Sequence, residues 1–192
     1  PGRIIGANGG GVNDKGIQSW HENLSLDRTR DDSLHTGVPV GSQNVLLHST
    51  IRSAFRNTVW VQADRSWVED NTLLYGGTDG LALGGMSTDL EDRPTFANQV
   101  SVALVKNNRI VSPRISGIVS RSRSFDVDPD AESGDYNENI TLIGNRVRDH
   151  QSDEGIWLDY LADSTVDGNV VESVGVAIHP NAAPWRIYSD PD

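Results

Sequence analysis

The sequence contains no cysteine, and only two of its residues are lysines, Lys15 and Lys106. The absence of cysteine excludes disulfides, zinc–thiolate sites and thiol nucleophiles. Against 16 Lys and Arg residues the chain has 20 Asp and 7 Glu, so its formal net charge is −11 at pH 7. A surface this acidic argues against broad nucleic-acid binding, which needs a basic footprint. It is compatible with bound divalent cations.

Long apolar runs are also missing, and the chain has 19 Gly but only 8 Pro. No segment reaches the roughly 20 apolar residues of a membrane-spanning helix, so we expect no membrane span. Val, Ile and Leu recur instead in short runs, which is typical of many short strands joined by turns. The chain begins at Pro1 without a methionine. We therefore expect a processed or excised piece, and the missing leader carries no information on location.

A short pattern of Gly or Thr followed by alternating apolar residues recurs along the chain, with a basic period of about 21 residues and two long intervals. Its copies begin at Gly16, Gly37, Thr58, Gly80, Gly117, Gly155 and Gly175. A column of polar residues precedes the last five copies, formed by Ser49, Asn71, Asn108, Asn145 and Asn169. Apolar residues lie two positions after this column (Ile51, Leu73, Ile110, Val147, Val171) and three before it (Leu46, Val68, Val105, Leu142, Val166).

Each copy is too short to bury its own strands, but stacked copies bury a continuous core, as in a solenoid. The pattern N-[IV]-T-[LV]-x-G-N-x-[IV] followed by G-[IV]-x-[LV], as in Asn139–Val147 and Gly155–Leu158, resembles the coil repeats of the pectate-lyase-like superfamily. The resemblance implies an all-β, right-handed parallel β-helix, and we predict about seven coils in one domain over residues 1–192. Loop insertions are expected at about 84–98 and 121–137, and a C-terminal tail at 181–192.

The repeated polar residues have structural roles in this interpretation. Asn tolerates a left-handed turn conformation, and its amide can donate and accept along a stack of identical turns. The repeated Gly permits a tight corner before each strand. We therefore expect function to depend on residues that the repeat does not need.

Counting outward positions from the repeated Gly places several chemically active side chains on one face. Three tryptophans on it are candidate substrate-binding residues that stack on sugar rings: Trp20, Trp60 and Trp157. The candidate catalytic residues are Asp79, Arg121, Glu154, Asp159 and His179. Both insertions follow the same strand of their coils, so we expect them to wall one side of this face and form a groove.

Two catalytic arrangements fit these residues. Asp79 and Glu154 are expected two coils apart, roughly 10 Å between backbones, which suits the carboxylate pair of an inverting glycosidase. Arg121 and His179 suit charge neutralisation and proton transfer in the β-elimination of a uronate. The alternatives are solvated turn carboxylates, surface ion pairs, and tryptophans that pack under the inserted loops.

The acidic segment of the second insertion is a candidate Ca²⁺ site. Asp126, Asp128 and Asp130 alternate at the short spacing from which oxygen ligands hold this ion, although the pattern is not that of an EF-hand. A plain acidic loop is the alternative. His21 and His35 are expected to be turn and surface residues rather than ligands.

The leading functional hypothesis is a carbohydrate-active protein that acts on an extracellular polysaccharide, as a lyase or glycoside hydrolase, located outside the cell or at its surface. The alternatives are a non-catalytic structural or adhesive β-helix, such as a fibre, tailspike or surface-layer component, and a polysaccharide-binding module. Uncapped solenoid ends tend to pair, so end-to-end or homo-oligomeric association is a further expectation.

Overall fold

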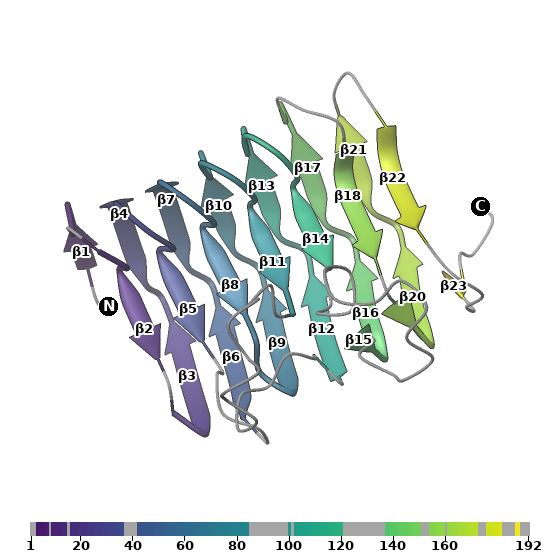
Figure 1. Cartoon of the computed structure of the whole chain (residues 1–192), viewed down its shortest axis with the longest axis horizontal. Helices are drawn as coiled ribbons and strands as arrows, with labels where there is room; N and C mark the ends of the chain where they lie inside the picture. Colours follow the sequence, from purple (N-terminus) through teal and green to yellow (C-terminus); the bar gives the residue numbers. More distant parts are fainter. Residues whose placement is uncertain are drawn as a thin grey trace, which may run out of the picture.

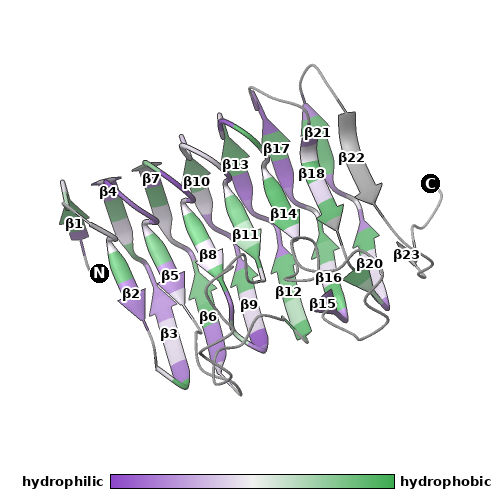
Figure 2. Cartoon of the chain, viewed as in Figure 1, coloured by the Kyte–Doolittle hydropathy of each residue, from purple (hydrophilic) through white to green (hydrophobic). Residues whose placement is uncertain are grey.

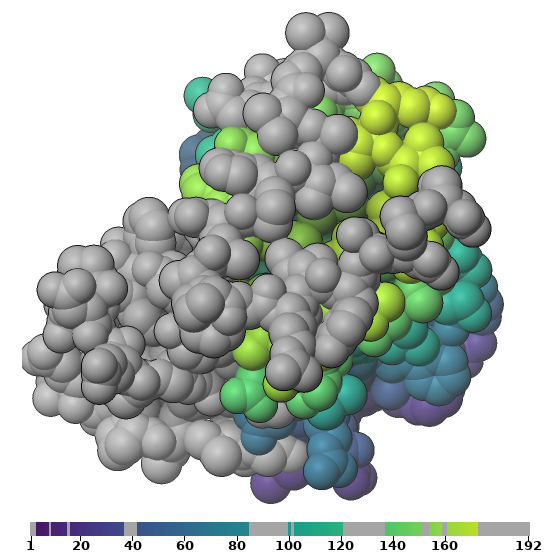
Figure 3. Space-filling model, turned by 90° about the vertical axis from the view of Figure 1, so that its right-hand side faces the viewer, coloured from purple at the N-terminus to yellow at the C-terminus, as the bar shows by residue number. Residues whose placement is uncertain are grey.

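The computed structural model of the chain is an all-β parallel solenoid (Figure 1). It describes residues 3–7, 9–14, 16–36, 42–84, 100, 102–120, 137–150, 154–159, 161–172, 176–181 and 187–188. For residues 159, 176–181 and 187–188 only the backbone is described. No helix occurs within these ranges. Seen from the C-terminal side, the yellow and green residues of the last coils lie in front of the blue and purple residues of the first coils (Figure 3).

Each coil contributes one strand to each of three seven-stranded sheets. Sheet A contains β1 (Arg3–Ile5), β4 (Ser25–Thr29), β7 (Thr50–Ala54), β10 (Thr72–Leu74), β13 (Arg109–Val111), β17 (Arg146–Arg148) and β21 (Val170–Glu172). Sheet B contains β2 (Val12–Asp14), β5 (Leu34–Thr36), β8 (Val59–Val61), β11 (Leu81–Leu83), β14 (Ile118–Ser120), β18 (Glu154–Asp159) and β22 (Val176–Asn181).

Sheet C contains β3 (Gln18–Glu22), β6 (Gln43–Leu47), β9 (Arg65–Glu69), β12 (Val102–Lys106), β16 (Ile140–Ile143), β20 (Ser164–Asp167) and β23 (Ile187–Tyr188). The short strands β15 (Asn137–Glu138) and β19 (Leu161–Ala162) pair separately. Both long intervals of the repeat follow sheet B strands, β11 and β14, as the sequence predicted. Most residues of the expected insertions, and most of the expected tail, lie outside the described ranges.

The register confirms four of the seven repeat copies and corrects three. Thr58, Gly80, Gly117 and Gly155 each precede the paired core of a sheet B strand. In the first two coils this place belongs to Gly11 and Ser33, because Val12 pairs with Leu34 and Leu34 with Val59. In the last coil it belongs to Ala177, because Ile156 pairs with Ile178. The alignment at Gly16 and Gly37 was wrong because short Gly–apolar patterns are ambiguous where no ladder Asn marks the coil. At Gly175 it was wrong because the pattern lies six residues after Asn169, whereas the confirmed copies lie nine or ten residues after their ladder residues.

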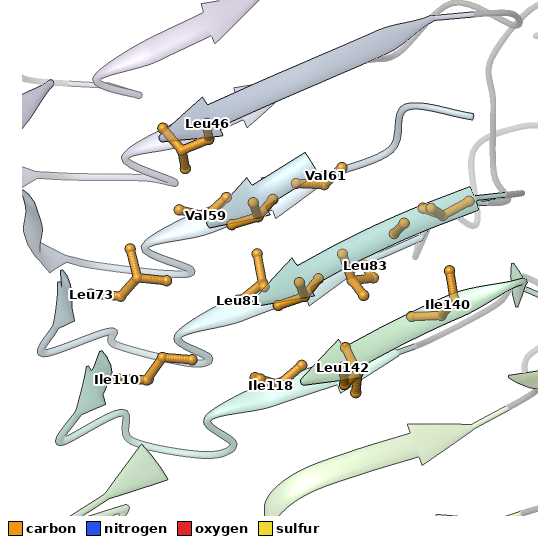
Figure 4. Close-up of a cluster of buried hydrophobic side chains, with 14 of the residues drawn as sticks. Leu46, Val59, Val61, Leu73, Leu81, Leu83, Ile110, Ile118, Ile140 and Leu142 are labelled. Carbon is orange, nitrogen blue, oxygen red and sulfur yellow. The ribbon is translucent and has the colours of Figure 1, made fainter. Parts of the chain in front are cut away.

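The core is made of the apolar columns that the repeat predicted. Leu46, Leu73, Ile110 and Leu142 are completely buried and point into one interior together with the sheet B residues Val59 and Leu81 (Figure 4). Fully burying one such side chain stabilises the fold by about 1.5–3 kcal/mol. No single coil provides enough of this burial to fold alone, so the coils depend on their neighbours.

An asparagine ladder crosses the turn between sheets C and A. Asn71 donates from N and Nδ2 to Asn108 Oδ1 at 3.1 and 3.0 Å, and Asn108 donates in the same way to Asn145 Oδ1 at 3.0 Å. Asn145 continues to Asn169 at 2.9 and 2.8 Å. Ser49 begins this part of the ladder by donating its backbone N–H to Asn71 Oδ1 at 2.9 Å. The ladder satisfies turn groups that the stacked coils remove from water.

One detail of the expected turn chemistry was wrong. The left-handed residue is not the ladder Asn but the residue before it, with φ of 55° at Asp70, 54° at Asn107 and 63° at Gly144. The repeated Gly117 is needed for space rather than for a positive φ. A Cβ built on it would lie 2.3 Å from Val147 Cγ1 and 2.6 Å from Gly155 O.

A second polar column lies at the turn that enters sheet B. Asn57 donates from N and Nδ2 to Asp32 Oδ1 at 3.0 and 2.9 Å, and Ser116 N donates to Asp79 Oδ1 at 3.0 Å. Asp32 and Asp79 are 4% and 1% exposed. Burial raises the pKa of Asp32 above its ordinary value of 3.8, against the opposing effect of the hydrogen bond from the backbone of Asn57.

The Asn ladder predicts a large effect of Asn108→Ala. The substitution removes the acceptor of Asn71 and the donor that binds Val68 O at 2.9 Å, so buried polar groups lose their partners. We expect the free energy of unfolding in urea to fall by about 2–4 kcal/mol. Asn107→Gly is the matched control, because the adjacent position is left-handed and Gly adopts this conformation freely. Equal stability of Asn108→Ala and the wild type would contradict a supporting ladder.

The buried Asp32 predicts a pH-dependent stability difference from Asp32→Asn. Because its folded-state pKa is raised, the folded protein binds more protons than the unfolded chain between pH 3.8 and the raised value. This contribution to stability is complete below 3.8 and is lost as pH rises through the folded-state pKa. Wild-type stability relative to Asp32→Asn should therefore increase as the pH of urea titrations falls from about 7 to about 4. A pH-independent difference between the two proteins would contradict the effect.

Candidate functional site

The outer face of sheet B was the expected site. The strand register aligns the middle residues of its strands in one column, which we call the sheet B column. One residue from each strand lies in this sheet B column: Asn13, His35, Trp60, Ala82, Val119, Trp157 and His179. Trp60 and Trp157 are therefore on one face, as predicted. Ala82 and Val119 between them are buried, and β11 and β14 are hydrophobic along most of their length (Figure 2).

Trp60 is packed into a cluster of neighbouring side chains. The rings of His35 and Trp60 stack with centroids 4.3 Å apart and an interplanar angle of 7°. Arg56 Cζ lies 5.8 Å from the Trp60 ring centroid, and Trp60 Nε1 donates to Gly84 O at 2.8 Å. His35 covers one face of the indole, so that face is not free to stack on a ligand.

His35 is a strand residue rather than the turn residue that the sequence predicted. It lies in β5, and its Nε2 is 2.7 Å from Gln62 Oε1. The misplaced second repeat copy is the reason for this error, because it put the strand after Gly37. His21, likewise, lies in strand β3, with Nε2 3.0 Å from Asp14 Oδ2.

Asp79 and Glu154 lie in the same column, two sheet B strands apart, as predicted. Asp79 does not point outward, however, because it is 1% exposed and its carboxylate accepts the Ser116 N–H in the turn. Glu154 is partly exposed at the start of β18. The predicted outward position of Asp79 was wrong, and the pairing of these two residues in catalysis stays a prediction.

The other candidate catalytic residues are only partly described. Strand pairing places Trp157 beside His179, and Asp159 beside Asn181, at the C-terminal end of sheet B. The side chains of Asp159 and His179 lie outside the described part of the chain, as does Arg121. Asp126, Asp128 and Asp130, the candidate Ca²⁺ ligands, also lie outside it. Within the described ranges, no group of three or more His, Cys, Asp or Glu residues could hold a metal ion.

Trp20 lies on a different face from Trp60 and Trp157, which corrects the predicted site. It belongs to β3, and the register of sheet C places it in an outward column that we call the sheet C stripe: Trp20, Val45, Trp67, Leu104 and Thr141. Trp20 and Trp67 are 62% and 40% exposed. The strands that carry this stripe, β3, β6, β9, β12 and β16, run side by side along the lower edge of the solenoid in Figure 1.

Both stripe indoles are held by a glutamate two residues further along the same strand. Trp67 Nε1 donates to Glu69 Oε2 at 2.7 Å, and Trp20 Nε1 to Glu22 Oε2 at 3.4 Å. Lys106 Nζ lies 2.9 Å from Glu69 Oε1. The hydrogen bond from Lys106 lowers the pKa of Glu69, and the indole N–H lowers it further. The acceptor that orients Trp67 therefore stays ionised in mildly acidic solution.

Sequence reasoning missed Trp67, although a signal was present. Val68 belongs to a predicted inward column, so its neighbour Trp67 had to point outward in a strand. The outward positions counted from the repeated Gly lie on the strands after it, which form sheet B. The strands before the Asn column, which form sheet C, carry the more exposed tryptophans.

Polar side chains flank the sheet C stripe on both sides. One neighbouring column contains Gln18, Gln43 and Arg65, and the other contains Glu22, Glu69 and Lys106. Exposed aromatic faces beside planar amide, guanidinium and carboxylate groups are suited to a ligand with flat apolar faces and a polar edge. The stripe therefore offers stacking and hydrogen bonding along a straight line.

No protein-family model, no curated protein and no solved structure matches this chain. In the described part of the chain, no helix is long and apolar enough to cross a membrane.

Proposed function

We propose that this protein binds a linear polysaccharide along the sheet C stripe. The observation that carries the proposal is the pair of exposed indoles, Trp20 and Trp67, aligned in one column and each oriented by a glutamate. They lie two strands apart, which corresponds to about 10 Å along the solenoid. This spacing is close to the length of two sugar rings in an extended chain.

The fixed indoles favour binding because less side-chain freedom is lost when a ligand stacks on them. A solenoid also repeats its outer columns in a straight line, which matches a linear polymer better than a compact ligand. The two glutamates beside the stripe are balanced by Arg65 and Lys106, so the stripe offers no net positive charge to a polyanion. The proposed ligand of this stripe is therefore a neutral polysaccharide.

Two further features are part of the proposal. The repeats at Asn139–Val147 and Gly155–Leu158 resemble the pectate-lyase-like superfamily, and we place the chain in that superfamily on this resemblance. A polysaccharide ligand supports a location outside the cell or at its surface. Binding at the stripe needs no catalytic group, so it suits a binding or adhesive solenoid as well as an enzyme.

The stripe predicts that Trp20→Ala and Trp67→Ala each weaken binding of neutral oligosaccharides about 5- to 30-fold, which corresponds to about 1–2 kcal/mol for an aromatic platform. Calorimetry with cello-, xylo- and manno-oligosaccharides measures the effect. Phe55→Ala is the matched control, because Phe55 is 72% exposed but lies at the corner between sheets A and B. Wild-type protein that binds none of these ligands, or tryptophan variants that bind like it, would refute the proposal.

A second candidate function is polysaccharide cleavage at the C-terminal end of sheet B. The register favours it, since it brings Trp157 and His179 together and keeps Glu154 and Asp159 on the same strand as Trp157. We expect a matching substrate to release reducing ends or, for a lyase, products that absorb near 235 nm, and Glu154→Gln to lower the rate at least 100-fold, as for a general acid or base. No product from a panel of acidic and neutral polysaccharides, with folded protein, would eliminate this candidate.

A further inference from the structure

A cavity of about 570 Å³ lies at the corner where the chain passes from sheet A to sheet B in the first coils. Its lining includes Arg28, Arg30, Phe55 and Tyr75, around a floor that includes Thr29 and Ala54. The volume falls within the range of about 300–1,000 Å³ that is usual for small-molecule sites. The corner belongs to the turns after β4 and β7, away from the strands of sheet C. It is therefore a separate site from the sheet C stripe.

The local sequence explains why the corner is hollow. Arg28 and Ser53, the next-to-last residues of β4 and β7, have φ of 58° and 59°, and Tyr75, directly after β10, has φ of 58°. Each coil therefore bends in a left-handed conformation where it leaves sheet A. Thr29 follows Arg28, and Ala54 follows Ser53. Both residues are small and buried, 4% and 5% exposed, and they form the floor of the cavity.

The cavity has an exposed aromatic wall. Phe55 is 72% exposed and Tyr75 is 56% exposed. Gly77 is the neighbour of Phe55 in the next coil, and a Cβ on Gly77 would lie 1.9 Å from Phe55 O. Glycine is therefore required there, because a side chain would collide with the backbone of the coil before it.

The cavity is positively charged within an acidic protein. Arg28 and Arg30 both line it, and none of the described lining residues is acidic. Arg28 Nε lies 3.5 Å from Asp27 Oδ2, but the Arg28 side chain is 67% exposed. No ion pair joins Arg30 to another residue of the described ranges, so its guanidinium is available to an anion. A planar guanidinium binds a carboxylate with two parallel hydrogen bonds.

We propose that this corner binds a sugar ring that carries a carboxylate. The arginines bind the carboxylate, and Phe55 or Tyr75 stacks on the apolar face of the ring. Neither feature alone selects this ligand: a guanidinium accepts any oxyanion, and an aromatic ring accepts any flat apolar face. Their combination in one shallow cavity selects a ligand with both groups on one ring. The ligand is either a free acidic monosaccharide or a residue of an acidic polymer.

Glucuronate is the probe for the site, with glucose as its neutral counterpart, and ligand-observed NMR and calorimetry measure binding. We expect Arg30→Gln and Phe55→Ala each to weaken glucuronate binding about tenfold or more, since charge-assisted hydrogen bonds and aromatic stacking are the main contacts. Arg109→Gln is the control, because Arg109 is an exposed arginine of β13 outside the cavity. Glucose should bind at least tenfold more weakly than glucuronate. A stronger signal from oligoglucuronate than from the monosaccharide would identify a polymer as the source.

Three results would overturn the proposal. The first is that the wild type binds no glucuronate at millimolar concentration, and the second is that both variants bind glucuronate as the wild type does. The third is that benzoate or sulfate binds more tightly than glucuronate. Failure here is distinguishable from failure of the sheet C stripe. Trp20→Ala should leave glucuronate binding unchanged, and Phe55→Ala should leave neutral oligosaccharide binding unchanged.

Discussion

The stacking of one coil on the next through parallel strands is the constraint on which the whole structure depends. Each coil has too little apolar surface to fold alone, and its turns bring polar groups into the interior. The Asn71–Asn108–Asn145–Asn169 ladder resolves this conflict, because each amide accepts from the coil before it and donates to the coil after it or to a nearby carbonyl. An unpaired buried polar group would oppose stacking by about 1–3 kcal/mol in each coil.

Stacking also aligns equivalent side chains of successive coils in columns, and these columns define the outer faces of the solenoid. A residue one position away from a core residue points outward in every coil, so outward side chains align along the solenoid. On sheet B the result is the His35–Trp60 stack, in which neighbouring coils cover each other's rings. On sheet C, Val45 separates Trp20 from Trp67, and both indoles stay exposed. The same fold thus makes one packed aromatic cluster and one open aromatic line.

The buried carboxylates of sheet B show that the column in which a residue lies does not by itself identify a functional site. Asp32 and Asp79 occupy the column in which a catalytic carboxylate was expected, yet both accept backbone hydrogen bonds in a buried turn. Their role resembles that of the ladder asparagines, and the raised pKa of Asp32 records the cost of placing a charge there. The open corner near Arg30 and Phe55 has the opposite character, because its charged and aromatic groups remain exposed and do not support the fold.

The sequence by itself determined the all-β solenoid, its apolar columns and its Asn ladder, because these features repeat and each copy supports the others. Only the tertiary structure decided three features: the face on which Trp20 lies, the burial of Asp79, and the open corner near Arg30 and Phe55. No ladder Asn precedes the first two sheet B strands, and the last one lies at an atypical distance from Asn169. Their register therefore depends on the pairing of whole strands with neighbouring coils rather than on a local motif. The burial of Asp79 and the openness of the corner depend on side chains from adjacent coils, about 20 or more residues away in the chain, which no short sequence pattern records.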